Sequence, residues 1–178
     1  ECGWSRNPQA ATALFTGMVT DSGRFRYDAT NARTFRLASY LMEQPIDTNA
    51  LYRNLYASDY AQLVVRAKFL LHVQFTEKNV AYVYTTMDGK GEYGVDDFTL
   101  SRGMVNSMAD MRGVDIWVNF TESDKGVLCE LRSSRFNINP IAVKYGGGHM
   151  KASGATLKNR EEAMAMLHDL DEMMGESK

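Results

Sequence analysis

Cysteine and histidine are both scarce in this sequence. The two cysteines, Cys2 and Cys129, form no CxxC pair or other metal-type spacing, which favours reduced thiols in a cytosolic protein over a disulfide framework. The three histidines, His72, His149 and His168, form no HxD, DHH or HxxxH cluster. Because a two-metal hydrolytic centre needs several Asp and His ligands, this sequence cannot complete such a centre by itself.

An excess of positive charge and a long apolar run are also lacking. The 178 residues include 20 Lys and Arg against 22 Asp and Glu, so a general attraction to phosphate cannot be the main source of affinity for nucleic acid, and any such contact must be local. The apolar runs are short, and the N-terminus lacks the charged and apolar regions of a signal peptide. The sequence therefore predicts neither a membrane span nor export, and a cytoplasmic location is expected.

Before residue 72 the apolar residues recur with helical spacing. Helices are predicted over residues 8–18 with Asn7 as the cap, from Thr30 or Asn31 to Pro45, after Asp47, and after Ser58 up to residue 71, most of them opened by a capping side chain. The expected inner stripes are Ala11, Leu14, Phe15 and Met18 in the first helix and Leu63, Val64, Ala67, Leu70 and Leu71 in the last. No strand precedes the first helix, so its apolar face has no evident partner.

From Val73 the period changes to the alternation typical of strands. Two hairpins are predicted, 73–85 turning at 77–79 and 116–131 turning at 123–126, with a helix from Asp96 or Asp97 to Met108 between them. A short helix from Asn139-Pro140 to the glycines 146–148, a strand near 155–157 and a final helix opened by Asn159 and Glu162 complete the pattern. The predicted fold class is therefore α/β, a mixed sheet of about five strands with flanking helices.

A glycine run is the strongest local feature of the sequence. Gly146, Gly147 and Gly148 follow the short predicted helix, and His149 comes directly after them. Glycine permits positive φ and a close approach of the backbone, so consecutive N–H groups can form an anion nest, and His149 can donate to a phosphate oxygen. The alternative is a helix C-cap with a flexible turn, because glycine ends helices routinely for backbone reasons.

Arg132 and Ser133 stand at the end of a predicted strand. The planar guanidinium of Arg132 is suited to phosphate and Ser133 adds a hydroxyl donor, although neighbouring strand residues face opposite ways. The alternative is a solvated strand end, since exposed arginines are common. Asn137 and Asn139 are expected to cap the helix that follows.

Asp21 lies in the segment GMVTDSGRF, residues 17–25, at a predicted helix-to-turn corner. A carboxylate there can reach a hard cation or Mn²⁺, but one carboxylate does not make a metal site. The alternative is an Asx turn, in which the side chain stabilises its own corner.

Together these segments resemble the DHH/DHHA1 phosphoesterases. Residues 17–25 are similar to that family's fourth DHH motif, with Asp-Ser-Gly where the family usually has Asp-Thr-Gly, and residues 146–155 are similar to the DHHA1 signature. Leu131-Arg132-Ser133-Ser134 resembles the strand that precedes this signature. The resemblance runs from about Gln9 to the C-terminus, and the motif spacing is most similar to that of bacterial bifunctional oligoribonucleases and 3′-phosphoadenosine-5′-phosphate phosphatases.

The resemblance implies a C-terminal remnant of a DHH domain (residues 1–57), a linker helix (58–71) and a DHHA1 substrate-binding domain (72–178). It also implies a pair of Mn²⁺ ions held mainly by an N-terminal DHH domain, which is missing here, with Asp21 as a metal ligand and catalytic residue. The substrate-binding residues that it implies are Arg132, Ser133, Gly146, Gly147, Gly148 and His149. The missing domain, or a second copy of the chain in a homo-oligomer, would cover the apolar face of the first helix.

Three functions are considered, in decreasing order of expectation. The first is the substrate-binding part of a Mn²⁺-dependent phosphodiesterase or phosphatase that acts on short single-stranded RNA and on 3′-phosphoadenosine-5′-phosphate, without activity of its own. The second is the C-terminal part of a cyclic-dinucleotide phosphodiesterase, which shares both motifs. The third is a non-catalytic RNA-binding module like the DHHA1 domains of alanyl-tRNA synthetases, although such a module has no need of the Asp21 motif.

Overall fold

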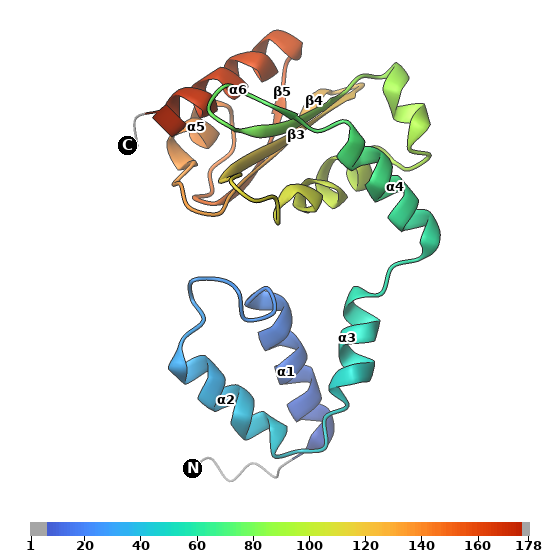
Figure 1. Cartoon of the computed structure of the whole chain (residues 1–178), viewed down its shortest axis with the longest axis vertical. Helices are drawn as coiled ribbons and strands as arrows, with labels where there is room; N and C mark the ends of the chain where they lie inside the picture. Colours follow the sequence, from blue (N-terminus) through green and yellow to red (C-terminus); the bar gives the residue numbers. More distant parts are fainter. Residues whose placement is uncertain (1–6, 176–178) are drawn as a thin grey trace. The chain divides into compact units, whose positions relative to one another are not determined.

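The computed structural model describes residues 7–175, which divide into two compact units, one ending at Ser58 and the other beginning at Asp59. The described part of the first unit is helical, and the second unit contains a sheet (Figure 1).

Three helices form the described part of the first unit: α1 (Pro8–Asp21), α2 (Ala32–Met42) and α3 (Thr48–Tyr56). Their caps are those that the sequence predicts, because the side chains of Asn7, Asn31 and Asp47 each accept a backbone N–H of the first turn. The three helices therefore begin where their capping residues place them.

The core of the first unit is small and consists of Phe15, Val19, Ala38 and Leu51. The predicted stripe of α1 is right for Ala11 and Phe15 and wrong for Leu14, which is 60% exposed. Helix α1 continues beyond its predicted end to Asp21, and Val19 is fully buried one turn after Phe15. The extra turn shifts the buried face toward residues 11, 15 and 19, a spacing of four that keeps side chains on one side of a helix.

A five-stranded mixed sheet is the centre of the second unit. Its strands lie in the order β1 (Gln74–Phe75), β2 (Ala81–Thr85), β3 (Ile116–Ser123), β4 (Gly126–Ser133) and β5 (Ala152–Leu157). Strands β2 and β3 are parallel and the other neighbours are antiparallel. The α/β class and both predicted hairpins are confirmed, while β3, β4 and β5 are each longer than predicted.

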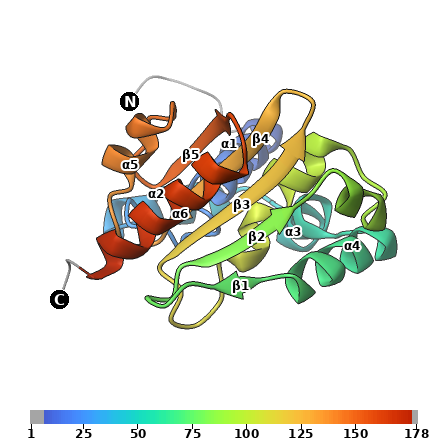
Figure 2. The ribbon, with the colours of Figure 1, turned by 90° about the horizontal axis from the view of Figure 1, so that it is seen from above.

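The sheet is covered on both faces. Helices α5 (Asn139–Lys144) and α6 (Arg160–Gly175) pack on one face, where Val118 and Phe120 meet Met166 and Leu170 (Figure 2). Because side chains alternate along a strand, Trp117 of β3 points to the opposite face, which packs against α4 (Tyr60–Leu71) and the segment between β2 and β3.

Helix α4 turns a different face inward from the predicted one. Phe69 is fully buried and Val65 packs beside it, whereas Leu63 is exposed and Leu71 is 85% exposed. Apolar residues occupy more than half of the circumference of this helix, so periodicity alone does not tell which stripe the sheet covers. No helix among residues 7–175 is both long and apolar enough to cross a membrane.

The connection between the parallel strands β2 and β3 is less regular than predicted. In place of one helix from Asp96 or Asp97 to Met108 there are a π-helical turn η2 (Thr99–Gly103) and a 3₁₀ turn η3 (Val105–Met108). Another 3₁₀ turn, η1 (Asp88–Glu92), precedes them. Asp96 does open this segment, since its carboxylate accepts both the amide and the hydroxyl of Thr99, and these hydrogen bonds lower the pKa of Asp96.

The side chain of Asn119 explains the irregular turn. It is fully buried on β3, and its Nδ2 donates to the carbonyl oxygens of Leu100 and Ser101, each at 2.8 Å. A side chain that inserts into the i→i−4 ladder disturbs regular helical pairing, and the disturbed turn here is π-helical. The regular helix was predicted wrongly because its apolar pattern gives no sign of Asn119, which lies on β3.

Candidate functional site

Arg132 lies near the end of β4, on the sheet face opposite α6. Its side chain is 14% exposed and forms an ion pair with Glu130, which is 15% exposed, at 2.9 Å between Nη2 and Oε2. Nη1 donates to the carbonyls of Leu131 and Ser153. The guanidinium is thus held within the β4–β5 strand pair by three of its five N–H groups.

Ser133 faces the other side of the sheet, as the alternation of a strand predicts. It is buried, and its hydroxyl accepts the amide of Phe136 at 2.8 Å. The hydroxyl therefore stabilises the turn that follows β4, and a role of Ser133 in substrate binding stays a prediction.

The three glycines donate their amides within the protein. The amides of Gly146 and Gly147 donate to carbonyls of α5, and that of Gly148 donates to Oγ of Ser153 at 3.0 Å. Gly146 has a φ of +88°, and a Cβ at position 147 would collide with the Ser153 hydroxyl. These contacts are those of a helix C-cap pressed against β5, so an anion nest at the glycines stays a prediction.

Ser153 brings two of the predicted substrate-binding segments together. Its carbonyl accepts Arg132 and its hydroxyl accepts the amide of Gly148, so the end of β4 and the glycine run meet at one strand. His149 comes next in the chain and is exposed. The prediction that the Asn139 side chain caps α5 is wrong, because this side chain donates to the carbonyl of Gly148. The side chain of Asn137 accepts the amide of Asn139.

The helix before the glycines is fixed to α6 by a partly buried carboxylate. Lys144 and Tyr145 both donate to Oδ2 of Asp169, at 2.6 and 2.7 Å. Burial raises the pKa of Asp169, but the hydrogen bonds from Lys144 and Tyr145 outweigh this and lower the pKa below its ordinary value. The ion pair sets the position from which the glycine run starts.

Asp21 is the last residue of α1 and its side chain is exposed. The corner after it is stabilised by Ser22 rather than by an Asx turn, because the Ser22 hydroxyl donates to the carbonyl of Met18 and accepts the amide of Phe25. Within residues 7–175 no group of three or more His, Cys, Asp or Glu side chains is placed to hold a metal ion. Asp21 as a metal ligand therefore stays a prediction.

The three residues after Ser22 have a left-handed backbone. Gly23, Arg24 and Phe25 have φ values of +57, +64 and +63°, and this conformation is costly for the two residues that carry a Cβ. The Phe25 ring packs at 5.4 Å from the ring of Phe35, and the Tyr27 ring covers Gly23 so closely that a Cβ there would collide with it. Aromatic packing therefore holds the corner that carries Asp21.

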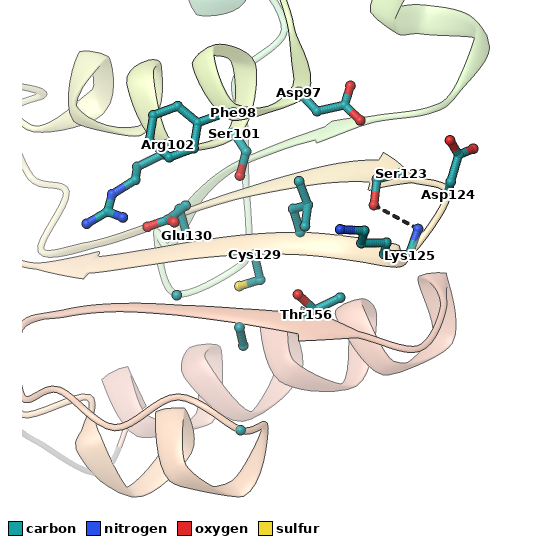
Figure 3. A pocket seen from close by; sticks show the side chains of 14 residues that line it. Asp97, Phe98, Ser101, Arg102, Ser123, Asp124, Lys125, Cys129, Glu130 and Thr156 are labelled. Atoms are coloured by element: carbon teal, nitrogen blue, oxygen red, sulfur yellow. Dashed lines mark hydrogen bonds between the residues drawn. The ribbon is translucent and has the colours of Figure 1, made fainter.

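A groove of about 670 Å³ opens on the sheet face opposite α6, between the β2–β3 connection and strands β4 and β5 (Figure 3). The connection contributes Asp97, Phe98, Ser101 and Arg102, the β3–β4 turn contributes Ser123, Asp124 and Lys125, and the strands contribute Leu128, Cys129, Glu130, Gly154, Ala155 and Thr156. Gly146 also borders it. The groove thus reaches from the glycine run toward the β3–β4 turn.

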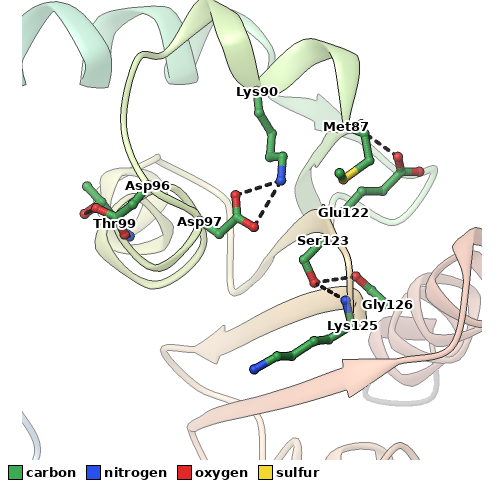
Figure 4. Close-up of polar contacts among 9 residues, drawn as sticks. All are labelled: Met87, Lys90, Asp96, Asp97, Thr99, Glu122, Ser123, Lys125 and Gly126. Carbon is green, nitrogen blue, oxygen red and sulfur yellow. Dashed lines mark hydrogen bonds and ion pairs between the residues drawn. The ribbon is translucent and has the colours of Figure 1, made fainter.

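Two of the carboxylates of this groove are already paired. Asp97 binds Nζ of Lys90 with both oxygens, at 2.8 and 3.0 Å (Figure 4), and Glu130 binds Arg132. Arg102 and Lys125 have no ion-pair partner in the described part of the chain. Of the unpaired charges in the groove, two are positive and one, that of Asp124, is negative.

Phe98, Arg102 and Lys125 were not predicted from the sequence as functional residues. Phe98 and Arg102 are four residues apart in the predicted helix, a spacing that puts two side chains on one side, and an aromatic ring beside an arginine was the signal available. Lys125 lies in a predicted turn and carries no such signal.

Residues 75–176 match the model of the DHHA1 domain. This chain belongs to the DHHA1 family. The resemblance that the sequence carries is thereby confirmed for the second unit, and the mixed sheet with its flanking helices is the fold of this DHHA1 domain.

The relatives of this DHHA1 protein include phosphoesterases. A bifunctional oligoribonuclease and PAP phosphatase NrnA from Bacillus subtilis is 31% identical over 177 residues, 99% of this chain and 56% of the relative. Its namesake from Mycoplasma pneumoniae is 33% identical over 168 residues, 93% of this chain and 51% of the relative. A crystal structure of an exopolyphosphatase-related protein from Bacteroides fragilis has a TM-score of 0.81 at 25% identity, over 94% of this chain and 51% of that one. The chain thus spans about half the length of these relatives.

Proposed function

We propose that this chain is the substrate-binding part of a Mn²⁺-dependent phosphodiesterase and phosphatase that acts on short oligoribonucleotides and on 3′-phosphoadenosine-5′-phosphate. The observation that carries the proposal is the similarity, over 99% of the chain, to a protein whose name states both activities. The DHHA1 match supports the coarser conclusion that the chain is a module of a DHH-family phosphoesterase.

The binding role is assigned to the segments that meet at Ser153. A phosphate at this end of the sheet would first encounter the exposed imidazole of His149, which binds more strongly when protonated. Arg132 would bind next, by exchanging its bond to the Ser153 carbonyl for two charge-assisted hydrogen bonds to the phosphate. Such an exchange keeps the guanidinium paired throughout.

The metal belongs to the proposal and not to the site described above. Mn²⁺ would stabilise negative charge on the phosphoryl group and supply a nucleophilic hydroxide. Asp21 is a candidate for one of its ligands, but the described residues do not form the rest of a metal site. We therefore assign no step to the metal here and expect that this chain alone hydrolyses nothing.

The test compares this chain with a protein in which a DHH domain precedes it. Each is incubated with Mn²⁺ and either RNA of two to five nucleotides or 3′-phosphoadenosine-5′-phosphate, and released mononucleotide or phosphate is measured. We expect activity in the longer protein alone, lost in Asp21→Asn and retained in the matched variant Asp88→Asn, whose carboxylate is also exposed. Hydrolysis by the 178-residue chain itself, or full activity of Asp21→Asn, would contradict the proposal.

A second candidate is favoured by one comparison. A cyclic-di-AMP phosphodiesterase GdpP from Geobacillus thermodenitrificans is 29% identical over 153 residues, 84% of this chain but 22% of the relative. Adding cyclic di-AMP to the same assay separates the two, because a preference for it over RNA would replace the first proposal. Binding of RNA without hydrolysis by the longer protein would instead indicate a module that only binds.

A further inference from the structure

We infer that the groove between the β2–β3 connection and strands β4 and β5 binds one unpaired nucleotide together with its phosphate. This inference rests on the proposed function, because it adds a second place of contact for a nucleotide substrate. A volume of about 670 Å³ lies within the range of small-ligand sites in proteins. Gly146 and the β3–β4 turn both line the groove, so a nucleotide strand held at the glycine run could continue into it.

The first argument is an aromatic ring without a packing role. Phe98 is 67% exposed at the mouth of the groove, whereas its neighbour Leu100 is fully buried in the core. An exposed phenylalanine contributes little to folding, but its flat face offers a stacking platform, and every base has a face to stack on it. Such a contact requires an unpaired base, so it selects single-stranded over double-stranded nucleic acid.

The second argument is the pair of cations on either side of the opening. The guanidinium carbon of Arg102 lies over one face of the Phe98 ring, 5.9 Å from its centre, so a base would stack on the other face with Arg102 beside it for the phosphate. Lys125 enters from the β3–β4 turn on the other side (Figure 3). Since Asp97 and Glu130 are neutralised by Lys90 and Arg132, the opposing charge that remains is Asp124.

The third argument is that a buried side chain of the sheet holds the backbone of the turn that carries Phe98 and Arg102. Asn119 is fully buried and binds the two carbonyls of η2 that lie between Phe98 and Arg102 in the chain. The hydroxyl of Ser101 is thereby held at the groove and the two exposed side chains start from a defined backbone. A platform fixed before the ligand arrives loses less entropy on binding.

The test measures binding of three probes to the full 178-residue chain by calorimetry: pentaadenylate RNA, a ribose-phosphate pentamer without bases, and AMP. Phe98→Leu and Phe98→Ala should weaken binding of pentaadenylate about fivefold or more, the effect of losing one stacked base, and leave binding of the abasic pentamer unchanged. Arg102→Gln and Lys125→Gln should weaken both pentamers. Each should also reduce the slope of log K against log salt by about 0.7, the value for one phosphate contact on a single strand.

Matched controls come from the same unit. Phe75→Ala removes a similarly exposed phenylalanine from β1, and Arg66→Gln removes an exposed arginine from α4, and both should bind all probes like the unchanged chain. Thermal unfolding of each variant shows whether it is folded, which we expect because Phe98 and Arg102 are exposed.

Two outcomes would support the inference, and they distinguish a free nucleotide from part of a strand as the ligand. If AMP binding depends on Phe98 as pentaadenylate binding does, the groove takes a free nucleotide, and if only the pentamer depends on Phe98, the groove takes part of a strand. The inference is overturned if Phe98→Leu and Phe98→Ala cost no more affinity than Phe75→Ala. These measurements involve no hydrolysis. A longer protein without activity would therefore refute the proposed function but not nucleotide binding in the groove. An active longer protein whose binding does not depend on Phe98 would refute the groove and not the proposed function.

Discussion

The ion pair between Arg132 and Glu130 leads to the sharpest prediction, because Arg132 can have a structural role, a role in phosphate binding, or both. If Arg132 chiefly holds the β4–β5 pair together, its removal destabilises the second unit. If Arg132 serves chiefly to bind phosphate, its pair with Glu130 adds little to that stability. A double-mutant cycle with Arg132→Met, Glu130→Gln and both together separates these cases.

The size of the effect follows from the geometry. Arg132→Met leaves a carboxylate that is 15% exposed without its partner, which should cost about 3 kcal/mol of unfolding free energy, the lower end for a buried pair. Glu130→Gln leaves both carbonyl bonds of Arg132 in place and should cost about 1 kcal/mol. The double variant should cost clearly less than the sum, with a coupling of about 1.5–3 kcal/mol, the range for a hydrogen bond between charged groups.

Amide hydrogen exchange of β4 and β5 in the full chain measures these free energies for the second unit alone. A coupling below about 0.5 kcal/mol, as in exposed ion pairs, would refute the reasoning. The same variants report on function, because Glu130→Gln releases one side of the guanidinium and should raise affinity for AMP, while Arg132→Met should lower it.

Three further predictions concern other parts of the chain. Asn119→Ala should cost about 2–4 kcal/mol, since two buried carbonyls lose their donor, and should speed amide exchange in residues 99–108, whereas unchanged exchange there would contradict the account of η2. Gly23→Ala should destabilise the first unit by about 1–2 kcal/mol or more, because of its positive φ and its contact with Tyr27, while Gly17→Ala, with open space around it, should not, as exchange of α1 amides can show. Because the pKa of Asp169 is lowered in the folded protein, its ion pair stabilises at neutral pH and is lost as the pH falls below about 4. The stability difference between the unchanged chain and Asp169→Asn in urea should therefore shrink on acidification, and a constant difference would be inconsistent with this.

Local signals in the sequence were sufficient for most of the fold. Capping by Asn7, Asn31 and Asp47, the change of period at Val73 and the glycines after α5 each act within a few residues, so the sequence shows them directly. What the sequence did not show depends on distant partners. The inward face of α4 is decided by the sheet, and the irregular η2 turn is decided by Asn119, which lies on another element.

Part of the candidate site could likewise be predicted from the sequence, and the rest depends on residues that are distant in the chain. The predicted residues Arg132 and Gly148 do meet, through Ser153, but the sequence could not show that their hydrogen-bonding groups are already engaged there. Phe98 and Lys125 come together at the groove only because the connection folds back over β4. Asp21 was recognised from its motif, and its geometry alone, an exposed helix end, would not have drawn attention to it.

The parallel pairing of β2 with β3 has a consequence for how the second unit forms. The hairpins β1–β2 and β3–β4 join residues that are close in the chain, and such hairpins form within microseconds. Pairing β2 with β3 must first close residues 86–115 into a loop, and the entropy lost in that closure is regained only when the pairing is made. The groove lies beneath this loop, so it should be among the last features to appear during folding and among the first to open under mild denaturant.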